Sequence, residues 1–289
     1  MFEDAKGSNG TWTESAIYTP TVFQAPFGVI FDSHGNLYSF DYQYALEYTS
    51  STTGPWTQSI LYTFTGTTYA VGNPVFDSAG NLYGVTEFVS NSEPGSIFKL
   101  TPGSGGSWTE TTLYTFTDGS DGGAPNTPIL DSAGDIYVAA SQGGLTCGIA
   151  YYGASEPCGT IFELSPTTGG GWRGSTLYEF APGPTDGAFP YAGLVTDNVG
   201  NFYGTTEGGG ASGDGAVYKV SSSKGKWVSS LLYSFTGTDG DGSSPSDRLV
   251  LDSAGNLYGT TEDGGQYGGG NSFQAFTIFE WRMERNDSL

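Results

Sequence analysis

The chain has 289 residues, of which 15% are aromatic and only 13% are charged. Its formal net charge of −21 disfavours nucleic acid and anionic membrane surfaces as partners, because both carry negative charge themselves. No stretch approaches about 18 consecutive apolar residues, so we expect no membrane insertion. The 47 glycines recur between aromatic and β-branched segments, a pattern typical of many short strands joined by tight turns.

One segment recurs five times along the chain and defines its organisation. In each copy an aspartate is followed by a glycine three residues later and a tyrosine six residues later. The copies begin at Asp32, Asp77, Asp131, Asp197 and Asp252, with spacings of 45, 54, 66 and 55 residues. Tryptophan recurs in step, at Trp12, Trp56, Trp108, Trp172 and Trp227. Periods of this length indicate a repeat architecture.

Each repeat is predicted to form four strands. The fourth repeat shows them most clearly, with β-rich segments at 193–197, 201–207, 215–220 and 227–235. Such a unit, repeated five times, predicts an all-β, five-bladed β-propeller of four-stranded antiparallel blades, forming one repeat domain over residues 1–289. A β-solenoid is the competing architecture, but its coils are normally shorter.

The two ends of the chain predict how the ring closes. Residues 12–18 match the fourth strand of a repeat, and residues 276–279 match a third strand. We therefore expect the N-terminal strand to complete the last blade near Ile278, which would leave no unpaired sheet edge. Residues 1–4 resemble a spare third strand, which leaves open that the chain is a fragment of a longer array.

The five repeated aspartates are interpreted as structural caps of tight turns. An aspartate side chain can accept backbone N–H bonds within a turn, while the following glycine adopts a positive φ. The alternative, a catalytic ring of carboxylates, would need perturbed ionisation at a shared site. The only histidine, His34, stands in one of these turns where other repeats have alanine or valine, so a Ser-His-Asp triad has no support.

Cys147 and Cys158 are the only two cysteines. Their spacing fits neither a CxxC redox motif nor a zinc site. We expect a disulfide that closes a surface loop, with Cα atoms roughly 4.4–6.8 Å apart, and hence an oxidising compartment. Two free thiols in a cytosolic protein are the alternative.

The repeat unit resembles a known bacterial family. The run Gly-Asn-Leu-Tyr-Gly-Thr-Thr-Glu at 255–262, the strand at 161–166 and the spacer at 232–240 are similar to the GloVer tandem repeat of Gloeobacter and Verrucomicrobia. The resemblance implies an extracellular or cell-surface protein, and it does not itself imply an enzymatic activity. The given sequence shows no signal peptide, and its tail differs from the family's anchoring signal.

Residues 190–203 are also similar to blades of NHL and gluconolactonase-type propellers, in which the strand ending in aspartate is innermost. This resemblance implies a central channel, with the aspartate turns on one face. Glu87, Glu207 and Glu262 end equivalent second strands and would lie on the opposite face, where Tyr42 and Ser141 occupy the matching positions.

Three carboxylates around a channel could hold Ca²⁺, which prefers several oxygen ligands. The alternative is three solvated glutamates at strand ends. The sequence therefore predicts a non-enzymatic extracellular binding or scaffold protein for a glycan or protein ligand. A hydrolase or lactonase-like enzyme with a carboxylate-held cation in the channel remains the alternative.

Overall fold

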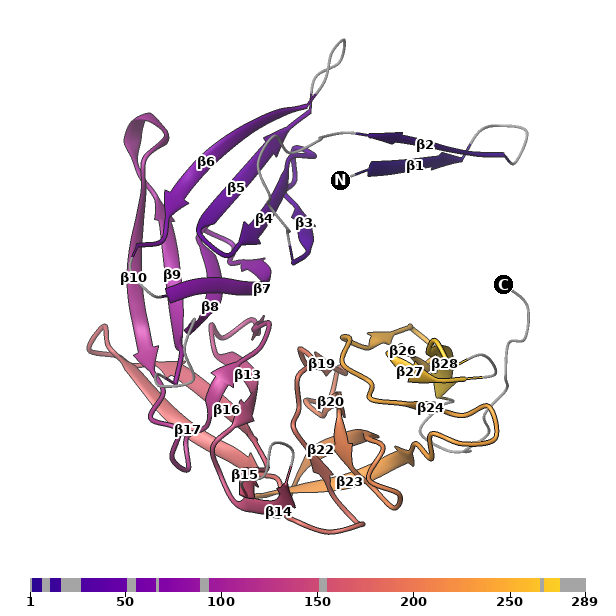
Figure 1. Ribbon diagram of the computed structural model, residues 1–289. Helices are drawn as coiled ribbons and strands as arrows, with labels where there is room; N and C mark the ends of the chain where they lie inside the picture. The colour runs from indigo at the N-terminus through magenta and orange to yellow at the C-terminus, as the bar shows by residue number, and fades with distance from the viewer. Residues whose placement is uncertain are drawn as a thin grey trace.

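The computed structural model describes residues 2–6, 11–16, 27–50, 56–65, 68–88, 94–150, 155–265 and 268–275. Apart from one 3-10 turn at Ser104–Gly106, their regular structure is entirely β-strand. The sheets are arranged in a ring as the five blades of a β-propeller (Figure 1), which confirms the predicted fold class. No helix in this described part of the chain is long and apolar enough to cross a membrane.

The blades share one antiparallel order, in which consecutive strands are neighbours. Blade 1 contains β3 (Val29–Phe31), β4 (Leu37–Asp41), β5 (Tyr44–Thr49) and β6 (Thr57–Thr63). Blade 2 contains β7 (Thr68–Phe76), β8 (Leu82–Phe88), β9 (Ser96–Pro102) and β10 (Trp108–Thr115). Blade 3 contains β11 (Gly123–Pro125) and β12 (Ile129–Leu130), which both pair with β13 (Ile136–Gln142), then β16 (Thr160–Pro166) and β17 (Trp172–Glu179).

Blade 4 contains β19 (Val195–Thr196), β20 (Phe202–Thr206), β22 (Ala216–Ser223) and β23 (Lys226–Ser234). Blade 5 contains β25 (Val250–Leu251), β26 (Leu257–Thr261) and β28 (Asn271–Ala275). Four two-stranded pairs accompany the blades: β1 (Phe2–Lys6) with β2 (Trp12–Ala16), β14 (Thr146–Ala150) with β15 (Ser155–Pro157), β18 (Gly187–Ala188) with β21 (Gly208–Gly209), and β24 (Gly242–Ser243) with β27 (Asp263–Gly264).

The first two strands of each blade are joined by one repeated turn. In blade 4, Asp197 Oδ1 accepts the backbone N–H groups of Val199 and Asn201 at 3.1 and 2.9 Å. Its Oδ2 accepts the Asn201 amide at 2.6 Å and the Tyr203 hydroxyl at 2.9 Å. The same pattern surrounds Asp32, Asp77 and Asp252, and at Asp131 it lacks the amide bond because Asp135 replaces the asparagine.

We predict that Asp197→Ala lowers the free energy of unfolding by about 1–3 kcal/mol, since it leaves several polar groups of the turn without an acceptor. Partial burial raises the pKa of Asp197, but the bonds from Asn201, Tyr203 and Val199 outweigh it and lower the pKa. A lowered folded-state pKa means that the stabilisation is complete above the ordinary value of 3.8 and fades as the pH falls through the folded-state value.

Chemical denaturation at pH 7 and at pH 3 measures this effect. Asn198→Ala is the matched control, because Asn198 is exposed in the same turn. Equal stability of the Asp197 and Asn198 variants at pH 7 would contradict the capping role.

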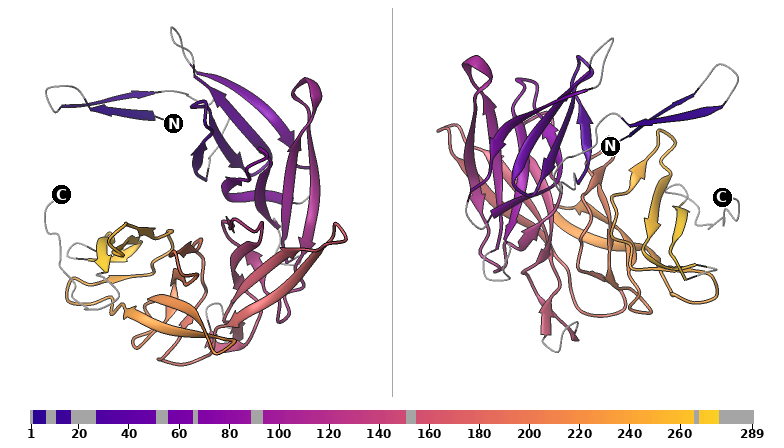
Figure 2. Two further views of the ribbon diagram at one scale, coloured as in Figure 1. Left: turned by 180° about the vertical axis from the view of Figure 1, so that it is seen from behind. Right: turned by 45° about the horizontal axis from the view of Figure 1, so that its top comes forward.

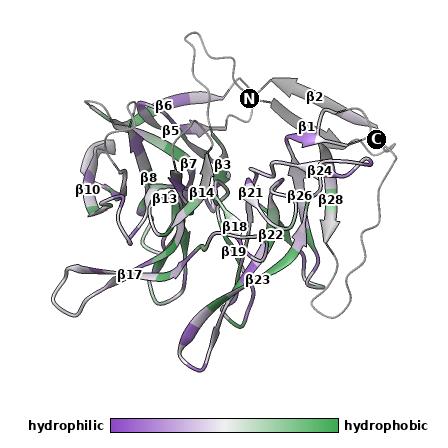
Figure 3. Ribbon diagram, turned by 60° about the horizontal axis from the view of Figure 1, so that its bottom comes forward, coloured by the Kyte–Doolittle hydropathy of each residue, from purple (hydrophilic) through white to green (hydrophobic). Residues whose placement is uncertain are grey.

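The hydrophobic core lies between neighbouring blades, where hydrophobic strand segments meet (Figure 3). Phe40 of blade 1 and Phe98 of blade 2 share one such cluster, with ring centroids 5.3 Å apart. A Cβ atom on Gly84 would lie 2.4 Å from Phe40 and 2.6 Å from Phe98, so the second glycine of the repeat makes room for these rings. The recurring tryptophans Trp108, Trp172 and Trp227 pack against successive inter-blade clusters, which explains their regular spacing.

The strand near Ile278, which is the expected partner of the N-terminal strand, lies outside the described residues. Strand β2 pairs with β1 in a separate hairpin, and β28 is the edge of a three-stranded blade 5 (Figures 1 and 2). The hairpin register, Phe2 opposite Ala16 and Lys6 opposite Trp12, repeats that of β9 and β10. Residues 2–6 thus supply β2 with a third-type strand nearby in sequence, and local pairing closes a far shorter loop than pairing with blade 5.

The third strand of blade 5 also begins earlier than expected. The predicted segment 276–279 lies outside the described residues, whereas β28 at Asn271–Ala275 pairs with β26. Phe273 of β28 packs beside Gly259 of β26, the same relation that Phe98 has to Gly84.

Cys147 and Cys158 form the predicted disulfide, with their Cα atoms 5.0 Å apart. The bond lies at the β14–β15 insertion, which accounts for the longest repeat spacing. Both residues are buried and belong to the core cluster between blades 3 and 4, together with Phe189. The bond therefore secures an inter-blade junction and not only a surface loop.

We predict that replacing both cysteines by alanine lowers the free energy of unfolding by about 3 kcal/mol, because the cross-link no longer restricts the unfolded chain. Thermal unfolding of the double variant, with and without dithiothreitol, measures the effect. Wild-type protein should become less stable on reduction, while the double variant should not respond. A wild-type melting temperature that is insensitive to full reduction would contradict the prediction.

Candidate functional site

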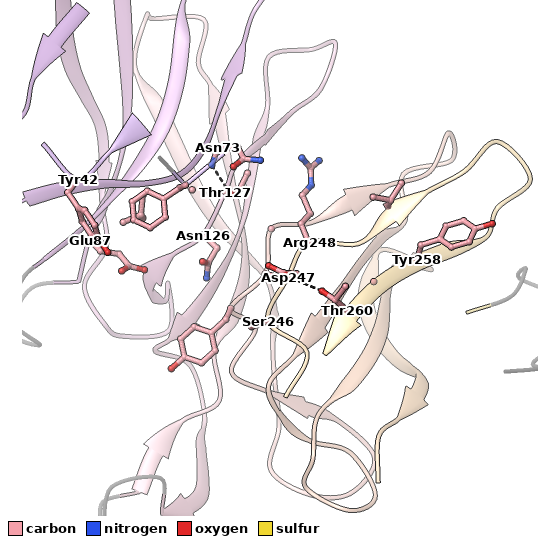
Figure 4. A pocket seen from close by; sticks show the side chains of 18 residues that line it. Tyr42, Asn73, Glu87, Asn126, Thr127, Ser246, Asp247, Arg248, Tyr258 and Thr260 are labelled. Carbon is pink, nitrogen blue, oxygen red and sulfur yellow. Dashed lines mark hydrogen bonds between the residues drawn. The ribbon is translucent and has the colours of Figure 1, made fainter. Parts of the chain in front are cut away.

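A cavity of about 760 Å³ lies where the inner strands of the five blades meet (Figure 4). Each blade contributes to its wall, through Phe27, Asn73, Asn126, Tyr191 and Asp247 respectively. These residues come four to six positions before the repeated aspartate of their blade, so the repeat itself places them around the cavity. The side chains at these positions differ from blade to blade, because the aspartate turn does not constrain them.

Hydrogen bonds between blades run through the same positions. The Asn73 backbone N–H donates to Thr127 Oγ1 at 3.0 Å and links blade 2 to blade 3. The Asn126 amide donates to the Pro190 carbonyl at 3.2 Å and links blade 3 to blade 4. Arg248 Nε donates to the Leu194 carbonyl at 3.0 Å and links blade 4 to blade 5. The cavity wall is therefore held by bonds that also fix neighbouring blades to each other.

Aromatic side chains contribute to the wall of the cavity. The rings of Phe27 and Tyr42 pack edge-to-face with their centroids 4.9 Å apart, and the rings of Tyr42 and Tyr69 do so with their centroids 5.5 Å apart. Phe27, Tyr42 and Tyr191 are 41%, 48% and 42% exposed, although they line a concave site. Large aromatic rings that are exposed inside a cavity are available to a ligand.

The three predicted metal ligands are not brought together. All three lie at the end of a second strand that is away from the aspartate turn, Glu87 within β8 and the other two just after their strands, but of the three Glu87 alone lines the cavity. Glu262 accepts a hydrogen bond from the Ser246 hydroxyl, and Glu207 follows β20 in blade 4. Within the described ranges, no group of three or more His, Cys, Asp or Glu side chains lies close enough to hold a metal ion.

The acidic loops between blades have a structural role that sequence reasoning missed. The Tyr114, Tyr178 and Tyr233 hydroxyls donate to Asp121, Asp186 and Asp241, at 3.0, 2.6 and 3.0 Å. Burial and the neighbouring Asp121 carboxylate raise the pKa of Tyr114 to about 12. The available signal was a tyrosine near the end of the outer strands of blades 2, 3 and 4, followed seven or eight residues later by an aspartate.

Burial raises the pKa of Glu87, whose carboxylate accepts no hydrogen bond from the described residues. Because the folded protein disfavours its charged form, stability should fall as the pH rises from the ordinary value of 4.5 through the raised folded-state value. We predict that Glu87→Gln removes this loss, so the variant should match the wild type at pH 4 and melt at a higher temperature at pH 7.

Thermal unfolding between pH 4 and pH 7 tests this expectation. Glu110→Gln, on the outer strand β10, makes the same charge change outside the cavity. If the two glutamine variants showed the same pH profile, the effect would arise from net charge and not from the cavity.

The fold and the cavity define this protein as a β-propeller assembled from tandem repeats. Residues 138–280 match the Gloeobacter/Verrucomicrobia repeat, which confirms for this part of the chain the resemblance read from the sequence. A comparison with curated proteins found no match.

Solved structures share the propeller fold at low sequence identity. A luciferin-regenerating enzyme is 14% identical with a TM-score of 0.54, over 88% of this chain and 74% of its own. A gluconolactonase from Xanthomonas campestris is 12% identical with a TM-score of 0.53, over 91% of this chain and 76% of its own. A puromycin-hydrolyzing peptidase from Mycobacterium tuberculosis is 13% identical with a TM-score of 0.56, over 96% of this chain and 40% of its own. At these identities the likeness concerns the fold alone.

Proposed function

We propose that this repeat propeller is a non-enzymatic binding module of the extracellular space or cell surface, and that it binds a glycan in the cavity between its blades. The observation that carries the proposal is the set of three exposed aromatic rings, of Phe27, Tyr42 and Tyr191, inside a concave site that also has polar groups in its wall. Ligand cavities combine apolar contact surface with a few placed polar groups, and this wall has both.

The chemistry of the wall suits a sugar better than an apolar ligand. The rings of Tyr42 and Tyr191 offer flat faces for the C–H surface of a pyranose. Asn126 and Thr260 also line the cavity. One amide N–H of Asn126 and the Thr260 hydroxyl proton are engaged within the protein, so the Asn126 amide can still donate to and accept from sugar hydroxyls, and the Thr260 oxygen can accept from them. A protein ligand is less favoured, because the exposed rings lie in a hollow and not on a broad surface.

The extracellular location is supported by the disulfide, because such bonds persist in oxidising compartments. The hydrolase alternative needed a carboxylate-held cation, and the described residues offer no such cluster. Two of the similar solved structures are named as hydrolytic or lactone-acting enzymes, but this likeness rests on the fold alone.

We predict that Tyr42→Ala weakens glycan binding roughly tenfold, by removing contact surface worth about 1.4 kcal/mol. A panel of immobilised oligosaccharides would identify a ligand, and calorimetry would compare the variants. Ile60→Ala is the control, since it removes an exposed apolar side chain from the outer strand β6. Equal loss in both variants, or no binding across a broad panel, would contradict the proposal.

A further inference from the structure

Arg248 is a cation that stands where the other blades have small or neutral residues. It lies four positions before the repeated aspartate, and the equivalent residues are Gly28, Asn73, Thr127 and Gly193. The other described cavity-lining residues include no lysine or second arginine. The chain has 30 acidic and 9 basic residues, and an arginine occurs at this position in one of the five repeats.

The Arg248 guanidinium is bonded to the protein through Nε, and its two Nη atoms are available to a ligand. Its Nε donates to the Leu194 carbonyl at 3.0 Å, which fixes the plane of the guanidinium. Within the described ranges, its terminal Nη atoms have no hydrogen-bond or ion-pair partner. The side chain is exposed, and it lines both the main cavity and a second hollow of about 560 Å³ beside the blade 4 and blade 5 turns.

The neighbouring carboxylate does not neutralise this arginine. Asp247 Oδ2 accepts the Thr260 hydroxyl at 2.8 Å, and in Figure 4 the Arg248 side chain extends away from this bond. Desolvation lowers the pKa of Arg248, but a guanidinium stays charged in proteins. The cavity lining therefore includes a positive charge, and its two terminal nitrogens have no partner within the described ranges.

We propose that Arg248 makes the cavity select saccharides that carry a carboxylate, that is, a uronic acid or a related acidic sugar. With Nε already engaged, the Nη1–Nη2 edge of the fork is the part that can bind both oxygens of a carboxylate. In Figure 4, Tyr42 of blade 1 and Arg248 of blade 5 lie on different sides of the cavity, so one ligand can meet both. This inference rests on the proposed glycan function and adds the class of glycan.

A purely structural role is the competing explanation, because the bond to Leu194 joins two blades. Such a role predicts that removing the guanidinium lowers stability and weakens binding of neutral and acidic sugars alike. Carboxylate recognition predicts a change in the ratio between the two affinities. The ratio therefore separates the explanations even where a variant is less stable.

The test compares methyl glucuronoside with methyl glucoside, which differ in a carboxylate, by ligand-observed NMR at low salt. We expect the wild type to bind the glucuronoside at least about tenfold more tightly. Arg248→Gln should abolish this preference while retaining glucoside binding, and Arg248→Lys should retain part of it, since lysine keeps the charge but not the fork. Arg173→Gln, an exposed arginine on the outer strand β17, makes the matched charge change and should leave the preference intact.

Each other outcome has a defined meaning. Equal binding of the two glycosides by the wild type would overturn the acidic-sugar inference and leave the glycan function standing. An equal loss of preference in the Arg173 and Arg248 variants would also overturn it, because net charge would then explain the effect. Binding of neither glycoside would overturn both the inference and the glycan function.

Discussion

The carboxylate of the inner-turn aspartate is the interaction on which every blade depends. Four blades repeat one set of bonds, in which two backbone N–H groups, an asparagine amide and a tyrosine hydroxyl converge on a single side chain. The turn thereby fixes the register of the first two strands and orients the tyrosine toward the next strand. Since every strand further out pairs onto this hairpin, a local bond sets the geometry of the blade.

The packing of blades against each other follows from the same unit. A glycine in the second strand admits an aromatic ring from the third strand, as Gly84 admits Phe98, and the recurring tryptophan packs into the adjacent inter-blade cluster. The residues four to six positions before the aspartate take part in neither the turn nor this ring packing, although several of them form hydrogen bonds between blades. They are therefore available to line the central cavity, and their variation from blade to blade gives the cavity both aromatic and charged walls.

Interactions within a repeat could be predicted from the sequence, and the strand pairing at the N-terminus could not. The turn of Asp197 involves residues at most six positions apart, so spacing alone reveals it. Likewise, the disulfide was predicted because no other cysteine competes for either partner. In contrast, the pairing of β2 with β1 was not predicted, although the two strands are neighbours in the sequence.

The candidate site also contains residues that the sequence pointed to and residues that it did not. The glutamates were chosen for their repetition, yet of the three only Glu87 lines the cavity, because equivalent positions in an irregular ring do not converge. Arg248 was missed because it occurs once and breaks the repeat. A comparison of the residues four positions before each aspartate would have singled it out, since a charge at an otherwise neutral position needs a reason. In this repeat protein, regular positions build the fold, and the exceptions mark the site.

A crystal structure with an oligosaccharide bound tests the central claim most directly. The account predicts a sugar ring in the cavity between the blades, in van der Waals contact with Tyr42 or Tyr191 at about 4 Å. A sugar bound on the outer strands, with the cavity unoccupied by ligand, would contradict it.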